Sequence, residues 1–123
     1  METAVAKLSR IAPEIAAHDL RESLTYYEQN LGFRVVSEMP EQKYAIVERD
    51  SIAIHLFEDS SRAHSPAGIH IFTDDLEELY AEFVSRGAKI TQQILRKPWG
   101  NRDFRVADPF GNELKFTEPV AED

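Results

Sequence analysis

The sequence predicts an α+β fold in which two tandem βαβββ modules form a curved mixed sheet around a cavity, with the helices on the outer face. The first observation is a repeat, because residues 11–36 and 69–90 both read as strand, Asp-Leu, amphipathic helix, glycine and strand. The second is that residues 51–58 and 111–118 are alternating segments that align with an offset of 60. Helices packed on one face of mostly antiparallel strands define this layered architecture.

The elements follow from hydrophobic period and turn residues in chain order. We expect strands near residues 10–17, 33–38, 43–49, 52–57, 68–73, 88–93, 102–107 and 113–118. We expect helices near residues 20–31 and 75–86. Asp19 is the natural N-cap of the first helix and Asp74 or Asp75 that of the second. Gly32 and Gly87 stand just past the helices, where a left-handed backbone is common.

The 123 residues fit a single domain spanning 1–123. We assign the first module to about residues 8–58 and the second to about 68–118. The polar stretch 59–67, which includes Pro66, reads as the linker between them.

Composition narrows the function classes. The chain has no cysteine, which excludes disulfides, zinc–thiolate sites and cysteine nucleophiles. It shows no apolar run of signal-peptide or membrane-span length, so we expect a cytoplasmic protein that does not bind membranes. A net charge of −8 with scattered basic residues argues against nucleic acid as a partner. The same charge attracts cationic ligands, or it serves solubility alone.

Strand alternation assigns the side chains to two faces of the sheet. Ile11, Pro13 and Ile15 are expected in the core, with Ala16 facing away. The non-core face then collects Glu14, His55, Phe57, His70, Phe72, Glu113 and Lys115. This mixture of aromatic and ionisable groups is typical of a ligand site, although the same residues would also suit a face open to water.

Two aromatic residues lie in turns. Trp99, the only tryptophan, is either a stacking platform for a planar ligand or a cover for a strand edge or a dimer interface. Phe110, within the turn Asp108-Pro109-Phe110-Gly111-Asn112, is expected to be exposed.

The duplicated layout, the segment LYAEF at 79–83 and the segment PWGNRDFRVADPFGNELKF at 98–116 resemble the vicinal-oxygen-chelate superfamily over about residues 8–118. That superfamily includes glyoxalase I, extradiol dioxygenases, and fosfomycin- and bleomycin-resistance proteins. The chain is most similar to the bleomycin-resistance proteins, which are acidic, metal-free dimers that sequester a cationic drug.

This resemblance also implies where a metal would be held. Metal-using members place one ligand on the first and the last strand of each module, and the matching positions here are Ala12, His55, Gly68 and Lys115. Only His55 has a suitable donor, so we expect neither a metal nor another cofactor. A shifted site made of Glu14, His55 and His70 is the alternative.

We therefore expect a metal-free binding protein of the bleomycin-resistance type that sequesters an aromatic or cationic ligand, with no catalytic residue. Its ligand-binding residues would be Glu14, His55, Phe57, His70, Phe72, Trp99, Glu113 and Lys115. Lys115 would face an anionic or carbonyl group, which suits a cationic drug poorly. A homodimer is expected from the resemblance. The alternatives are a metal-dependent lyase, isomerase or dioxygenase, and a protein whose dimer surface is its function.

Overall fold

A computed structural model describes residues 5–119 and confirms the predicted order of elements. The first module contains β1 (Glu14–Ala17), α1 (Leu20–Gln29), β2 (Arg34–Met39), a short 3₁₀ turn (Pro40–Gln42), β3 (Tyr44–Arg49) and β4 (Ile52–Glu58). The second contains β5 (Gly68–Phe72), α2 (Leu76–Ser85), β6 (Lys89–Arg96), β7 (Arg102–Ala107) and β8 (Glu113–Thr117).

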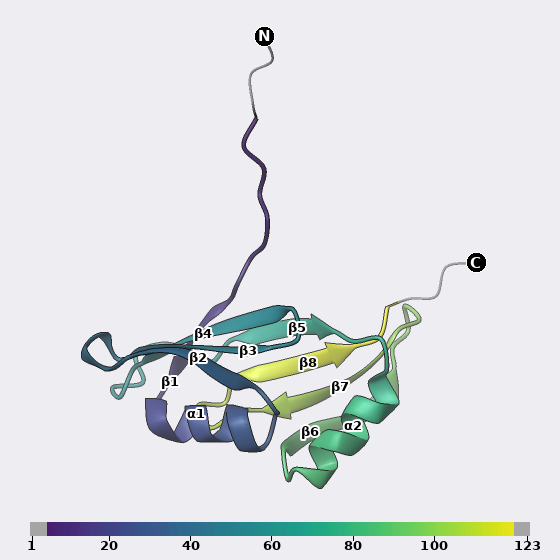
Figure 1. Ribbon diagram of the computed structural model, residues 1–123. Coiled ribbons are helices and arrows are strands. Elements are labelled where there is room, and N and C mark those ends of the chain that lie inside the picture. Colours follow the sequence, from purple (N-terminus) through teal and green to yellow (C-terminus); the bar gives the residue numbers. More distant parts are fainter. Residues whose placement is uncertain (1–4, 120–123) are drawn as a thin grey trace.

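Each module forms its own four-stranded sheet. The strand orders are β1-β4-β3-β2 and β5-β8-β7-β6, so the second sheet repeats the topology of the first. The first and last strands of each module pair in parallel, and the other pairs are antiparallel. Figure 1 shows both helices on the same side of the strands. The predicted α+β fold of two mixed-sheet modules is confirmed, although within residues 5–119 no strand of one sheet pairs with a strand of the other.

Helix capping follows the sequence pattern. The Asp19 carboxylate accepts a hydrogen bond from the backbone N–H of Glu22, and the Asp75 carboxylate accepts one from Glu78. Asp75 is therefore the N-cap of α2. Gly32, with φ of 72°, adopts the left-handed backbone expected after α1.

The core is one cluster that crosses both modules. Leu24 and Tyr27 of α1 lie on one helical stripe and are buried, as is Phe83 of α2. Phe83 packs edge-on against Phe104 and Phe116, with ring centroids 5.9 and 5.0 Å away. Because the two helices share this core, the modules are packed as one unit.

The turn between β7 and β8 joins the second module to the first. The buried Asp108 accepts hydrogen bonds from the Tyr27 hydroxyl at 2.7 Å and from the Asn112 side chain at 2.9 Å. The same Asn112 amide donates to the carbonyl oxygen of Ala16 at 2.8 Å. The sequence of this turn predicts only a hairpin connection, but its buried Asp108 and Asn112 also form hydrogen bonds with the first module.

The first strand is shorter than predicted, and two burial assignments, those of Ile11 and Phe110, were wrong. Strand β1 begins at Glu14 rather than near residue 10, because Pro13 has no N–H to donate to a ladder. Ile11 is 93% exposed instead of in the core. Phe110, expected to be exposed, is only 7% exposed, and its backbone N–H donates to Asp108 within the turn. Ala16 is buried too but lies outside the core cluster, and its carbonyl oxygen accepts from the Asn112 amide.

None of the helices within residues 5–119 is both long enough and apolar enough to cross a membrane.

Candidate ligand-binding site

The face of each sheet that points away from the helices carries the predicted site residues. In β4, Ile54 and Leu56 are buried in the core, and His55 between them is half-buried on the opposite face. In β8, Leu114 and Phe116 are buried, and Lys115 is half-buried. The alternation that assigned these faces is therefore confirmed for both last strands.

In the first sheet, a hydrogen-bonded chain joins Glu14, Tyr44 and His55. Tyr44 Oη lies 2.7 Å from Glu14 Oε2 and 2.7 Å from His55 Nδ1. An ionised carboxylate can only accept, so the Tyr44 hydroxyl donates to Glu14. Its oxygen then accepts from His55 Nδ1–H, which leaves His55 Nε2 with a free lone pair. Tyr44 is a site residue that strand alternation did not single out.

Phe57 lies two residues beyond His55 on the same face of β4 and contacts the segment between the modules. Its ring packs edge-on against His64, with centroids 5.1 Å apart. His64 is held in turn by the Asp59 carboxylate, 2.8 Å from its Nδ1. Phe57 is thus already partly covered within the chain.

In the second sheet, a hollow of about 310 Å³ brings together three predicted residues and five others. We call it the C-terminal pocket. Its lining residues are His70, Phe72, Lys97, Trp99, Asn101, Asp103, Arg105 and Thr117. Trp99 is 69% exposed and Phe72 is 64% exposed, so both rings are available to a ligand.

The polar lining of this pocket is organised by Asp103, which is 5% exposed. Asp103 Oδ1 accepts from Gln92 Nε2 at 2.7 Å and lies 3.2 Å from Lys97 Nζ, and Oδ2 lies 3.6 Å from Arg105 Nε. Burial alone would raise the pKa of Asp103. The hydrogen bonds from Gln92 and Lys97 and the charge of Arg105 outweigh it and hold that pKa below its usual range. Asp103 therefore stays ionised and positions two cations.

Five residues of the pocket were not among the site residues predicted from the sequence: Lys97, Asn101, Asp103, Arg105 and Thr117. A signal for three of them was present. Once Phe104 and Val106 are placed in the core, alternation turns Asp103 and Arg105 to the other face, and with Leu114 and Phe116 in the core it turns Thr117 there as well. Lys97 and Asn101 lie in an irregular loop and carried no periodic signal.

Glu113 and Lys115 lie beside the pocket rather than in it. Lys115 Nζ is 4.0 Å from Glu113 Oε1, and Arg105 Nη1 is 3.4 Å from the same oxygen. A Cβ placed on Gly68 would sit 3.6 Å from Lys115 Nζ, so the ammonium packs over the bare backbone of Gly68. Gly68 and Lys115 are the two positions of this module at which metal-using relatives hold their ligands, and here the Lys115 ammonium group occupies that place.

The predicted residues thus form two groups. Glu14 pairs with His55 across β1 and β4, whereas His70 pairs with Lys115 across β5 and β8. All residues that line the C-terminal pocket come from the second module. Within residues 5–119, no group of three or more His, Asp or Glu side chains is placed to hold a metal ion. The alternative site of Glu14, His55 and His70 is therefore not assembled within residues 5–119 of one chain.

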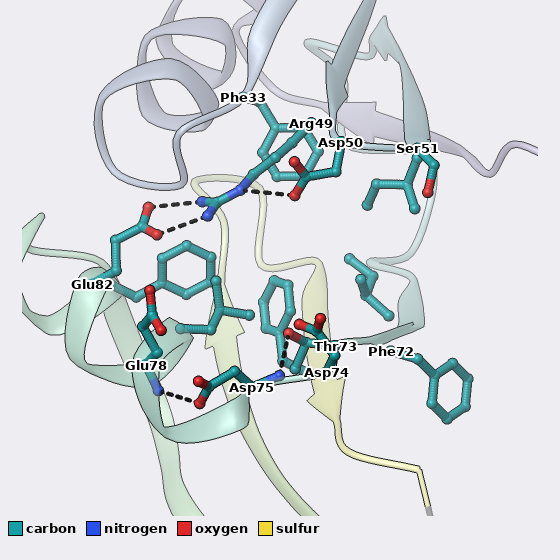
Figure 2. A pocket seen from close by; sticks show the side chains of 15 residues that line it. Phe33, Arg49, Asp50, Ser51, Phe72, Thr73, Asp74, Asp75, Glu78 and Glu82 are labelled. Carbon is teal, nitrogen blue, oxygen red and sulfur yellow. Dashed lines mark hydrogen bonds and ion pairs between the residues drawn. The ribbon is translucent and has the colours of Figure 1, made fainter.

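A second hollow, of about 240 Å³, lies between the modules (Figure 2). Its apolar lining includes Phe33, Phe83 and Phe116, and its rim is acidic. The Arg49 guanidinium at this rim is already paired with Glu82. Phe72 is the only predicted site residue around it, and Figure 2 shows that ring turned away from the others. We regard this hollow as part of the junction between modules.

Comparison with known proteins agrees with this architecture. Residues 7–116 match the sequence profile of the Glyoxalase/Bleomycin resistance protein/Dioxygenase superfamily. A bleomycin resistance protein of Geobacillus stearothermophilus is 28% identical over 127 aligned residues, which cover 88% of this chain and 95% of the relative. A bleomycin resistance protein of Staphylococcus aureus matches with the same values.

Solved structures share the fold. A bleomycin resistance determinant encoded on a transposon has a TM-score of 0.82 at 21% identity, covering 93% of this chain and all of that one. A bleomycin-binding protein complexed with bleomycin has a TM-score of 0.78 at 21% identity, covering 91% and 99%. A lactoylglutathione lyase from Agrobacterium tumefaciens has a TM-score of 0.72 at 23% identity, covering 91% and 95%.

Proposed function

The chain belongs to the Glyoxalase/Bleomycin resistance protein/Dioxygenase superfamily, and from that membership we propose that it is a binding protein that sequesters a small aromatic molecule without a metal. The observation that carries the proposal is the C-terminal pocket. Two exposed rings, Phe72 and Trp99, stand beside a half-buried polar lining. Apolar surface with a few fixed polar groups is the usual composition of a ligand site.

The bleomycin resistance relatives, together with a solved bleomycin-binding protein of the same fold, support a binding role. The residues of the pocket favour the aromatic alternative over the cationic one, because Lys97 and Arg105 line it and Asp103 is engaged with both. Lys115 packs over Gly68 in the second module, so an ammonium group stands at the two positions where metal-using relatives hold their ligands, which favours binding without a metal.

We also propose that the protein acts as a homodimer, in which a second copy completes each site. The Glu14–Tyr44–His55 chain and the C-terminal pocket lie on different sheets, and each is open on the face away from the helices. Residues 5–13 form no strand, and Val5, Leu8 and Ile11 are 80%, 103% and 93% exposed. Such a row of exposed apolar side chains is typical of an interaction surface.

The proposal is tested by titrating the protein with bleomycin and with a panel of uncharged aromatic compounds while following Trp99 fluorescence. A ligand should quench Trp99 and raise the melting temperature, since a ligand at 100 times its Kd adds about 2.7 kcal/mol of stability. Trp99→Leu and Phe72→Ala should weaken binding, and Val36→Ala, at an exposed apolar position on β2, should not.

Binding should be unchanged by EDTA. If no aromatic compound binds, sequestration is wrong; if EDTA abolishes binding, the metal-free mode is wrong.

A further inference from the structure

Most of the buried polar atoms that lack a hydrogen-bond partner in the described part of the chain belong to the C-terminal pocket. Five side-chain atoms are in this state, and three of them are Asn101 Oδ1, Arg105 Nε and Thr117 Oγ1. All three residues line that pocket, and Thr117 is only 5% exposed. Buried polar groups are normally paired, because an unpaired one loses water without compensation. No such atom belongs to a residue of the hollow between the modules.

Arg105 has the largest unused hydrogen-bonding capacity of the three. A guanidinium has five N–H donors, and Arg105 donates one long hydrogen bond of 3.4 Å, to Glu113. The carboxylate of Asp103 lies 3.6 Å from Nε, which is close enough for charge attraction but too far for a hydrogen bond. Only 27% of the Arg105 side chain is exposed, so water reaches only part of its hydrogen-bond donors.

The charge around this pocket is opposite in sign to that of the whole chain. Lys97, Arg105 and Lys115 contribute three positive charges, and Asp103 and Glu113 contribute two negative ones, which leaves one positive charge. The whole chain carries −8. The cations are fixed on a half-buried sheet face, where their attraction for an anion is screened less than at an open surface.

We propose that the C-terminal pocket recognises the carboxylate of an aromatic acid. This inference rests on the proposed aromatic-binding function and adds the chemical class of the ligand. The planar guanidinium of Arg105 matches a carboxylate in two parallel hydrogen bonds, and the Thr117 hydroxyl donates to the same group. The ring of the ligand packs on Trp99 and Phe72, which are the exposed aromatic residues of the lining.

Three probes of nearly equal shape test the proposal: naphthoate, its uncharged amide naphthamide, and the cation naphthylmethylamine. Their affinities for the full chain are measured by calorimetry at neutral pH. Naphthoate should bind about tenfold or more tightly than naphthamide, because it gains a charge-assisted pair, and naphthylmethylamine should bind weakest.

Arg105→Gln should remove this preference, lowering naphthoate affinity about tenfold and leaving naphthamide nearly unchanged. Arg34→Gln makes the same charge change at an exposed position on β2 and should leave all three affinities unchanged. Thr117→Val keeps the side-chain shape and should weaken naphthoate about threefold. Thermal melting of each variant establishes that it is folded.

The outcomes separate this inference from the function on which it rests. If naphthamide or naphthylmethylamine binds as tightly as naphthoate, the carboxylate is not recognised, although aromatic binding stands. If Arg105→Gln and Arg34→Gln lower naphthoate affinity equally, the preference comes from net charge and not from this pocket. If none of the probes binds, both the proposed function and this inference are wrong.

Discussion

The guanidinium of Arg49, at the end of β3, forms two parallel hydrogen bonds with the carboxylate of Glu82 on α2, at 2.8 and 2.7 Å. Arg49 also donates to the carbonyl oxygen of Leu31 at 2.8 Å and lies over the ring of Phe83. Glu82 accepts a third bond from Arg86 at 2.7 Å. Since Arg49 belongs to the first module and Glu82 to the second, this ion pair joins the modules at the surface of their shared core.

Glu82→Gln should lower the free energy of unfolding by about 1–3 kcal/mol at neutral pH, because two arginines lose a charged partner. The hydrogen bond from Arg49 is the largest effect that holds the pKa of Glu82 below its usual 4.5. A lowered folded pKa gives stability that is complete above pH 4.5 and is lost as the pH falls through the folded value.

The difference between Glu82→Gln and wild type should therefore shrink in acid, as measured by urea unfolding at neutral and acidic pH. Glu28→Gln, at an exposed position on α1, is the control. An equal loss at both pH values would contradict the ion-pair explanation.

Gly32→Ala should destabilise the protein more than Gly87→Ala. Both glycines have left-handed backbones, with φ of 72° and 74°, so each alanine costs about 1–2 kcal/mol of strain. At Gly32 the new Cβ would also lie 2.8 Å from Arg49 Nη1, whereas at Gly87 the nearest atom is 3.6 Å away. The melting temperatures of both variants measure this, and the additional decrease in Gly32→Ala is the cost of displacing Arg49. If the two variants melt together, Arg49 moves aside at no cost.

Tyr27→Phe should cost about 1–3 kcal/mol of stability, although it keeps the ring. Burial raises the pKa of Asp108, and hydrogen bonds from Asn112 and Tyr27 act against this rise. Loss of the Tyr27 hydroxyl raises the folded pKa further, so the penalty should be greatest at neutral pH, where Asp108 must ionise. Tyr80→Phe, a half-buried ring without a hydroxyl bond in the described structure, should change stability little. Similar losses in the two variants would contradict the role of the bond to Asp108.

In its neutral form the His55 imidazole should carry its proton on Nδ1 rather than Nε2, because Tyr44 directs its own proton to Glu14. Nitrogen chemical shifts of the labelled imidazole measure this, and Tyr44→Phe should abolish the preference. Partial burial and the bond to Glu14 raise the pKa of Tyr44 to about 12, which ultraviolet titration of the tyrosinate should show. A wild-type imidazole protonated mainly at Nε2 would overturn the assigned direction of the chain.

Ile11→Asp should convert the proposed dimer to a monomer without lowering the stability of the single chain, because Ile11 makes almost no contacts within it. Light scattering coupled to gel filtration measures the mass of both proteins at micromolar concentration. A wild-type protein that elutes as a monomer would refute the dimer. A dimer unaffected by Ile11→Asp would place its interface elsewhere.

The order of strands and helices was predictable because it depends on local signals that occur twice. Asp19 and Asp75 begin the helices, Gly32 and Gly87 follow them, and alternation assigns the strand faces. The predicted first strand was too long at its N-terminal end. The apolar pattern extends back to Ile11, but Pro13 has no N–H to donate, so strand β1 begins only at Glu14.

The candidate site was only half predictable. Alternation shows that His55 and His70 lie on corresponding faces of their sheets, but it does not say whether those faces meet in one chain. Lys97 and Asn101 were missed because irregular loops have no period to detect. Arg105 was identifiable in principle, since its neighbours Phe104 and Val106 are core residues on either side of it in the strand.

The bond between Asn112 and the carbonyl oxygen of Ala16 joins residues 96 positions apart and so has a consequence for biosynthesis. When β1, α1 and β2–β4 have left the ribosome, the Ala16 carbonyl and the Tyr27 hydroxyl still lack Asn112 and Asp108, their partners in the turn between β7 and β8. The first half of the chain must therefore wait for the second before it reaches its final state. Long-range contacts of this kind slow folding, and a truncated or stalled chain would present incomplete edges to its neighbours.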